Sequence, residues 1–334
     1  MDRTPRTAII LASILFLLVR PAVAHVAAWH KSMWCLNGTT PGVDNPNNRE
    51  PGTPLYNLKF EDWWFHHINK CDEFPPAEGD FLDLPANGHF TIEHATDRAF
   101  TTLSYDGNMT GVYIDGKDHL EGLDGGGECI TNPNIHAQNE SMAAGTAFAI
   151  SYQSDLSKVT LDNLVVFTVL YNTPWRRLAT YEVPNLPACP EGGCICAWGW
   201  IAEGCGQPNM YMLGFRCRVT GQPGHLPLAK PQSAVYCGEE KSATPAALRK
   251  NPKCVQGAKK FLSWQQKEGN TVHESQWADA GGQLKFPGYN ARMGFANGAQ
   301  PDIFDTRPTF ASLGGFFGIW RIMAAGHLAA GALF

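Results

Sequence analysis

The chain has 334 residues, a formal net charge of −5 and 44% hydrophobic residues. This length suits one large all-β domain or two ordinary domains, and the apolar fraction is sufficient for a packed core. The mildly acidic charge gives no support to nucleic-acid binding or to attraction by an anionic membrane surface.

The first 24 residues have the layout of a secretory signal peptide. Arg3 and Arg6 precede an apolar run over residues 8–19, and small residues end the segment at Ala24. We therefore predict a signal peptide over residues 1–24, cleavage after Ala24 and a secreted, extracellular protein.

Cleavage at this position would make His25 the N-terminal residue. An N-terminal histidine chelates a metal through its α-amine and its own ring, so one further histidine completes a T-shaped set of three nitrogens. Such an all-nitrogen, roughly planar set favours copper. The terminus alone is a weak signal, because signal cleavage also leaves histidine first by chance.

All ten cysteines lie beyond the predicted cleavage site. In an oxidising compartment, an even number predicts up to five disulfides, whose pairing the sequence does not fix. The alternative is a zinc cluster of four closely spaced cysteines, namely Cys189, Cys194, Cys196 and Cys205. Glycosylation acceptor motifs, which agree with secretion, begin at Asn37, Asn108 and Asn139.

Short apolar or alternating runs indicate strands, and no long amphipathic helices lie between them. This spacing predicts an all-β fold, a β-sandwich. Residues 106–133 are rich in glycine and aspartate. This composition predicts a long irregular loop. Short helices are expected over residues 60–68 and 245–249. The expected strands cover residues 89–94, 100–105, 147–152, 163–171, 178–183, 194–201 and 207–219.

Two conspicuous pairs of side chains are expected to be structural. Adjacent histidines at His66 and His67 point to different sides of a helix or strand, so they do not easily bind one ion together. Trp198 and Trp200 share one face of an extended segment, where core packing beside a disulfide is favoured over contact with a sugar.

A copper ion on an exposed face also needs limited access to its axial positions. A tyrosine placed axially is a weak or distant ligand and limits access from one side. Tyr211 suits this role because it lies in a strand-like segment, and Asn209, two positions earlier, points to the same side. Asn209 is expected to hydrogen-bond an oxygen species bound at the copper. The alternative for Asn209 is an ordinary polar strand residue.

Four strings in the sequence are far more specific than an N-terminal histidine. They are His25–Lys31 (HVAAWHK), Cys35–Thr40 (CLNGTT), Asp62–His67 (DWWFHH) and Ser141–Ser151 (SMAAGTAFAIS). Together they resemble the fungal lytic polysaccharide monooxygenases of auxiliary activity family fourteen, and the resemblance runs from His25 to about residue 300. It implies an immunoglobulin-like β-sandwich with long loops, one copper ion in a histidine brace, and oxidative cleavage of xylan lying on cellulose.

Under this resemblance His25 takes the brace position, and the second ligand is either His136 or His119. We favour His136 because it leads directly into an expected strand, whereas His119 lies in a charged loop. Tyr211 takes the axial position. The predicted copper ligands are therefore His25, His136 and Tyr211, and Asn209 joins them as a candidate catalytic residue.

The predicted monooxygenase domain covers residues 25–298 and leaves a hydrophobic tail over residues 299–334. Three small residues, a polar spacer and an apolar stretch from Ala311 form the pattern of a lipid-anchor signal. Arg321 and His327 count against an anchor and against a membrane-spanning helix. The alternative is an ordinary amphipathic tail.

We expect a monomeric, copper-dependent lytic polysaccharide monooxygenase that acts on insoluble polysaccharide, xylan-coated cellulose. Copper would cycle between Cu(II) and Cu(I), with an external electron donor as reductant and dioxygen or hydrogen peroxide as co-substrate. Two rivals remain, a non-catalytic copper-binding protein at the cell surface and a carbohydrate-binding module. Oxidised products in the presence of a reductant would separate the enzyme from both.

Overall fold

The computed structural model describes residues 25–130, 132–133, 135–202, 208–238, 245–273, 277–278 and 284–307. One group of strands comprises β1 (Ala27–Trp29), β3 (His89–Ala95) and β6 (Leu178–Glu182). A larger group comprises β2 (Leu82–Pro85), β4 (Thr146–Ser151), β5 (Val165–Leu170), β7 (Cys194–Ile201), β8 (Met210–Thr220) and β11 (Gly298–Ala299). The helices and the remaining strands are α1 (Phe60–Trp63), α2 (Pro245–Arg249), β9 (Trp277–Ala278) and β10 (Leu284–Lys285).

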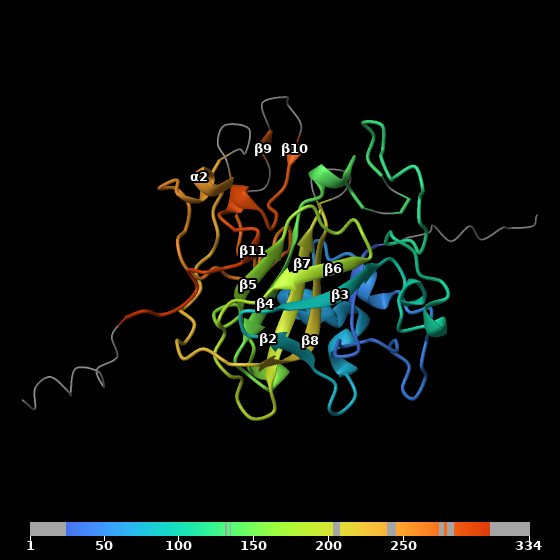
Figure 1. Ribbon diagram of the computed structural model, residues 1–334, viewed down its shortest axis with the longest axis horizontal. Helices are drawn as coiled ribbons and strands as arrows, with labels where there is room; N and C mark the ends of the chain where they lie inside the picture. Colours follow the sequence, from blue (N-terminus) through green and yellow to red (C-terminus); the bar gives the residue numbers. More distant parts are fainter. Residues whose placement is uncertain are drawn as a thin grey trace, which may run out of the picture.

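These strands form two packed sheets and a small ribbon of β9 and β10 (Figure 1). The smaller sheet has the order β1-β3-β6, and the larger has the order β11-β5-β4-β7-β8-β2. Neighbouring strands are antiparallel except β2, which pairs parallel with β8. The expected all-β sandwich is therefore confirmed.

The two sheets share a core because alternate side chains of each strand face the other sheet. Phe90 on β3 stacks on Tyr181 of β6 with ring centroids 5.4 Å apart, and Phe148 on β4 meets both rings edge-on. The Tyr181 hydroxyl lies within hydrogen-bond distance of the Thr146 hydroxyl, at 2.5 Å, and of His94 Nε2, at 3.3 Å. A small polar network thus lies inside an otherwise apolar core.

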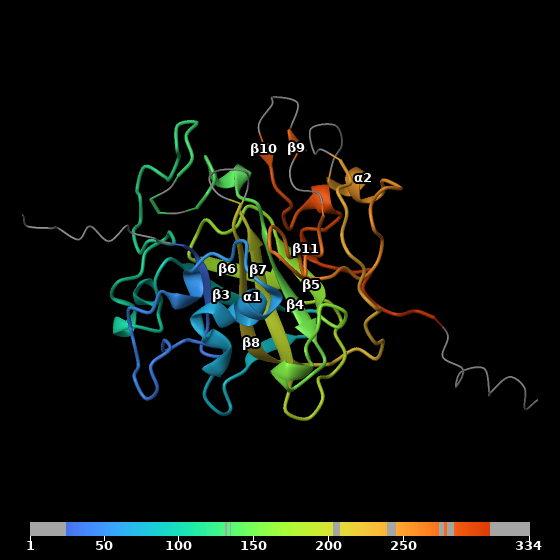
Figure 2. The ribbon, with the colours of Figure 1, turned by 180° about the vertical axis from the view of Figure 1, so that it is seen from behind.

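The other face of the larger sheet is covered as well, since α1 lies over it (Figure 2). Trp63 and Phe65 from the N-terminal half pack there together with Trp264 and Tyr289 from the C-terminal part. With both faces covered, all eight residues of β7 are buried. This explains why β7 has a continuous apolar run in place of alternation.

Most expected elements match the structure, but one strand prediction is wrong. Residues 100–105 form no strand and instead contain short 3-10 turns at Arg98–Phe100 and Tyr105–Gly107. The Asp97 side chain accepts a hydrogen bond from the Ala99 amide and so starts the first turn. In the second turn Asp106 has a φ of 51°, which interrupts any extended backbone.

Disulfides cross-link the described part of the chain. Their pairing rules out the zinc cluster. Two of its four cysteines pair as Cys189–Cys194, and Cys196 pairs with Cys217 across β7 and β8. The remaining described pairs are Cys35–Cys71 and Cys237–Cys254, and Cys129 is also disulfide-bonded.

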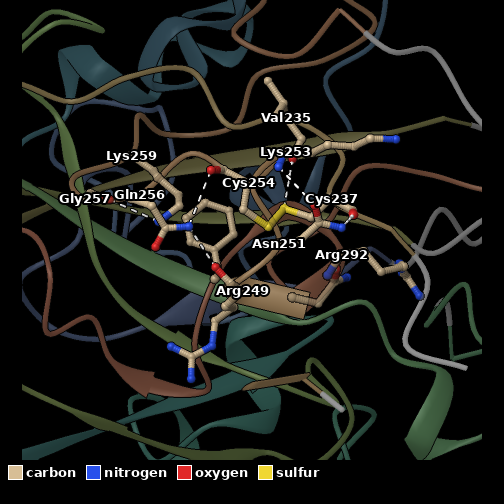
Figure 3. Close-up of a disulfide and its surroundings, with 12 residues drawn as sticks. Val235, Cys237, Arg249, Asn251, Lys253, Cys254, Gln256, Gly257, Lys259 and Arg292 are labelled. Carbon is tan, nitrogen blue, oxygen red and sulfur yellow. Dashed lines mark hydrogen bonds between the residues drawn. A yellow bond between two sulfur atoms is a disulfide. The ribbon is translucent and has the colours of Figure 1, made fainter. Parts of the chain in front are cut away.

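The Cys237–Cys254 disulfide holds the segment that carries α2 (Figure 3). Asn251 donates a hydrogen bond to the Cys237 carbonyl at 2.8 Å, and Gln256 donates to the Arg249 carbonyl at 2.8 Å. The C-terminal part therefore has local cross-links of its own in addition to its packing on the sandwich.

Both predicted end segments lie largely outside the described residues. The signal peptide over residues 1–24 is wholly outside, and the predicted tail is described only as far as residue 307. Within that piece, Ile303 is 1% exposed in the core between the sheets. Among the described residues no helix has the length and apolarity needed to span a bilayer.

Candidate metal centre

His25 stands two residues before β1, which pairs with β3 inside the smaller sheet. The register places Ala27 opposite Ala95, and Trp29 donates its indole N–H to the Ala95 carbonyl at 2.9 Å. This pairing fixes the direction from which the chain approaches His25. The histidine itself is 7% exposed.

His136 lies on the loop that leads into β4, and it is 5% exposed. Its φ of 54° is in the left-handed region, which histidine tolerates better than most side chains. The structure brings this ring next to the first histidine: the centroids of His25 and His136 are 6.1 Å apart and their planes differ by 30°. The two rings come from positions 111 residues apart in sequence.

Tyr211 completes the group from the second position of β8. Its ring centroid is 6.0 Å from that of His25. On its other side Tyr211 stacks on Trp200 of β7 with centroids 4.5 Å apart and planes 19° apart, because the β7–β8 register places these two residues opposite each other. Trp200 also meets the His136 ring edge-on at 6.0 Å. The structure thus brings together all three side chains predicted as copper ligands.

The Tyr211 hydroxyl is in an unusual environment for a phenol. Burial raises its pKa well above the ordinary value of 10.0, whereas the Asn209 side chain lowers that pKa by a smaller amount. Asn209 lies just before β8 and is 3% exposed. The hydroxyl makes no hydrogen bond of standard geometry with the described residues. Burial therefore opposes ionisation of the Tyr211 phenol.

His119, the alternative second ligand, lies elsewhere. Its Nε2 is 2.9 Å from Asp115 Oδ2, and its ring packs edge-on against Tyr113 at 5.2 Å. No ring contact joins it to the histidine at position 25 within the described part of the chain. The geometry therefore favours His136 over His119.

The adjacent histidines are structural, as the sequence predicts. His66 is fully buried with Nδ1 3.4 Å from the Met212 carbonyl, and burial lowers its pKa to about 4. His67 forms a hydrogen bond with Asp72 at 2.8 Å. Neither ring contacts the rings of the candidate site in the described chain.

Sequence reasoning missed Gly52, which supports the backbone of His25. Gly52 ends a 3-10 turn over Glu50–Gly52. A Cβ atom added at Gly52 would lie 2.8 Å from the His25 carbonyl oxygen and 3.3 Å from its carbonyl carbon. Only glycine fits this close approach of two backbones. A glycine between a proline and a threonine in a loop carries no sequence signal that would have revealed it.

The donor set fits copper in kind. His25 Nδ1 and His136 Nε2 are both buried nitrogens of the paired rings, and imidazole is a good ligand for copper. Among the described residues no group of three His, Cys, Asp or Glu side chains could hold a metal ion. A third strong donor would therefore have to be a backbone group, and the α-amine of an N-terminal His25 is one.

A family model for the lytic polysaccharide monooxygenases AA14 matches residues 7–314. The chain belongs to the AA14 family. It is 37% identical over 289 residues to the AA14 family lytic polysaccharide monooxygenase A of Trametes coccinea, across 85% of this chain and 62% of the relative. It is 35% identical over 303 residues to the AA14 family lytic polysaccharide monooxygenase B of Talaromyces rugulosus, across 85% of this chain and 94% of the relative.

A second Trametes coccinea relative, AA14 family lytic polysaccharide monooxygenase B, is 37% identical over 285 residues. This chain spans 62% of the length of each Trametes coccinea protein. The family match agrees with the family resemblance of the sequence motifs.

Proposed function

We propose that this AA14 protein is a copper-dependent lytic polysaccharide monooxygenase whose ion is held by His25, His136 and Tyr211. The observation that carries the proposal is the approach of the His25 and His136 rings to 6.1 Å, at a chain position where signal cleavage would leave an α-amine. The family match over residues 7–314 supports the same reading.

Each residue has a distinct part in this proposal. His25 would bind through its ring and its amine, and His136 would add the third nitrogen. Tyr211 would be a weak further ligand through its hydroxyl, whose ionisation burial opposes. When bound, copper supplies one-electron redox chemistry with an external electron donor and with dioxygen or hydrogen peroxide.

Asn209 is the proposed hydrogen-bonding group beside the reacting centre. It is 3% exposed, and its side chain lowers the pKa of the Tyr211 hydroxyl. A side-chain amide there would orient an oxygen co-substrate by donating a hydrogen bond. Trp200 would hold the Tyr211 ring in place by stacking on it.

We further propose insoluble polysaccharide as the substrate, with xylan on cellulose as the specific form implied by the family resemblance. Secretion is supported by the four described disulfides and by the family, since disulfides persist in oxidising compartments. A monomer released after residue 24 is the form that we expect to act.

The test is release of oxidised oligosaccharides from xylan-coated cellulose by copper-loaded protein supplied with ascorbate. His25→Ala and His136→Ala should each abolish release, and the matched histidine variant His119→Ala should retain it. Release by His25→Ala at the wild-type rate would refute the proposal. Tight copper binding by the wild-type protein without any oxidised product would favour the rival, a non-catalytic copper-binding protein.

A further inference from the structure

A cavity of about 640 Å³ opens on the side of the molecule where α1 and the turn after β4 meet. One wall comes from the α1 region, with Phe60 and Trp64, and the other from residues 155–160. The cavity shares no residue with the candidate copper site. The cavity is also distant from that site. Ser151, at the end of β4 nearest the cavity, pairs with Ile195 on β7. Ile195 is five positions from Trp200, which is about 17 Å along an extended strand.

The first wall of this cavity is aromatic. Phe60 and Trp64 stack with centroids 5.0 Å apart and planes 25° apart, and both are half-buried. Trp63 and Phe65 make T-shaped contacts with the Trp64 ring, with centroids 5.4 Å and 5.0 Å away. Because the two rings stack face to face, each covers one face of the other, and only one face of each is left to meet a ligand.

The rest of the lining is mixed: Phe65, Leu156 and Val159 are apolar, whereas Asp72, Asp155, Ser157 and Thr160 carry hydrogen-bonding groups. Asp72 and Asp155 have side chains 26% and 51% exposed. The Ser157 hydroxyl and amide donate to Asp155 at 2.7 Å and 2.9 Å and lower its pKa, so it stays ionised. No basic residue is in the lining itself, although Lys158 lies 3.9 Å from Asp155 and His67 lies 2.8 Å from Asp72. The two carboxylates disfavour phosphates and other anions.

The Trp64 indole adds a donor to these acceptors. Its N–H makes no hydrogen bond with any described residue, whereas the neighbouring Trp63 indole donates to the Glu268 carbonyl at 2.9 Å. An aromatic ring face, a spare N–H donor and carboxylate acceptors together suit a neutral ligand with an apolar ring face and many hydroxyls. A sugar chain has both properties.

From this arrangement we propose that the cavity between Phe60, Trp64 and Asp155 is a second saccharide-binding site, which holds one flexible β-linked polysaccharide chain. The proposal rests on the proposed function, because it supplies a second anchor on the same polymer. Two linked contacts with one fibre raise retention above that of either contact alone, without any change at the metal centre. A concave site suits a single hemicellulose chain better than a flat crystal face.

The test is calorimetric titration of xylohexaose into copper-free protein kept in EDTA. Trp64→Ala should weaken binding about tenfold, and Trp64→Phe, which keeps an aromatic ring, should restore most of it. Thr160→Arg blocks the cavity from the opposite wall and should also abolish binding, which keeps the test decisive if Trp64→Ala folds poorly. Tyr105→Ala, an exposed aromatic outside the cavity lining, should bind as the wild type does.

Unchanged xylohexaose binding in Thr160→Arg and in folded Trp64→Ala would overturn the proposal. So would tight binding of choline that Trp64→Ala abolishes while xylohexaose does not bind, since that result would make the wall an ammonium site. The proposed function is tested separately. Binding without oxidised products would refute only the oxidative function, and oxidised products without xylohexaose binding would refute only this second site.

Discussion

Trp200 and Tyr211 lie opposite each other on β7 and β8, and their rings stack with centroids 4.5 Å apart. The same tyrosine ring lies 6.0 Å from His25, and the same tryptophan lies 6.0 Å from His136. A stacked pair at the adjoining ends of β7 and β8 therefore packs behind both histidines, which lie outside the strands. This relationship explains how loop residues are placed with the accuracy that a metal site requires.

Replacing Tyr211 with phenylalanine should separate the structural part of this residue from its part at the metal. The ring stack on Trp200 is kept, and the lost hydroxyl is buried without a standard hydrogen bond in the described chain. We expect the copper-free protein to be as stable as the wild type or more stable. With copper bound, the electron paramagnetic resonance spectrum should change. An identical spectrum would remove Tyr211 from the axial position.

Gly52→Ala should disturb His25 without touching any proposed ligand. The new Cβ would lie 2.8 Å from the His25 carbonyl oxygen, so one of the two backbones must shift. Copper affinity, measured by competition with a chelator, should fall about tenfold. The matched control is Gly79→Ala, at a positive φ of 81° but with no atom within 4 Å of the added Cβ. Equal copper affinity in both variants would refute the positioning role of Gly52.

Unfolding of the copper-free protein should be strongly pH-dependent below neutrality. Burial lowers the pKa of His94 to about 3 and of His66 to about 4, whereas both rings titrate near 6.5 in the unfolded chain. The unfolded state therefore binds protons that the folded state refuses. The contribution of these histidines to the free energy of unfolding is fully present above pH 6.5. It is lost as the pH falls toward 4, by about 1.4 kcal/mol per pH unit for each histidine.

His94→Gln should remove one of these two contributions. Urea unfolding between pH 7 and pH 4.5 would show a shallower loss of stability than in the wild type. His225→Gln, at an exposed position, should leave the slope unchanged. A slope in His94→Gln equal to that of the wild type would show that His94 does not resist protonation in the folded state.

Much of the sandwich was predictable because its strands carry strong local signals. The run over residues 194–201 is apolar throughout and matches β7 at both ends, and the short helix over residues 245–249 matches α2. Residues 100–105 misled because a run that looks strand-like from its composition competes with an Asp97 cap that the pattern does not reveal.

The candidate site was predictable only in part. His25 was suggested by the processing signal, Tyr211 by its strand-like segment, and His136 by its place before an expected strand. The family resemblance then assigned them to one metal site. Their approach depends on long-range pairing between β1, β3, β7 and β8, which no local pattern encodes. Gly52 and the role of Trp200 emerge only when distant segments are packed together.

The most direct test of the central idea compares two versions of the secreted chain, one starting at His25 and one carrying a single extra glycine before it. If the amine of His25 and the rings of His25 and His136 hold one copper ion together, the extra residue should weaken copper binding by at least about 100-fold and alter the nitrogen hyperfine pattern of the Cu(II) resonance. Equal affinity and identical spectra for the two chains would contradict the account.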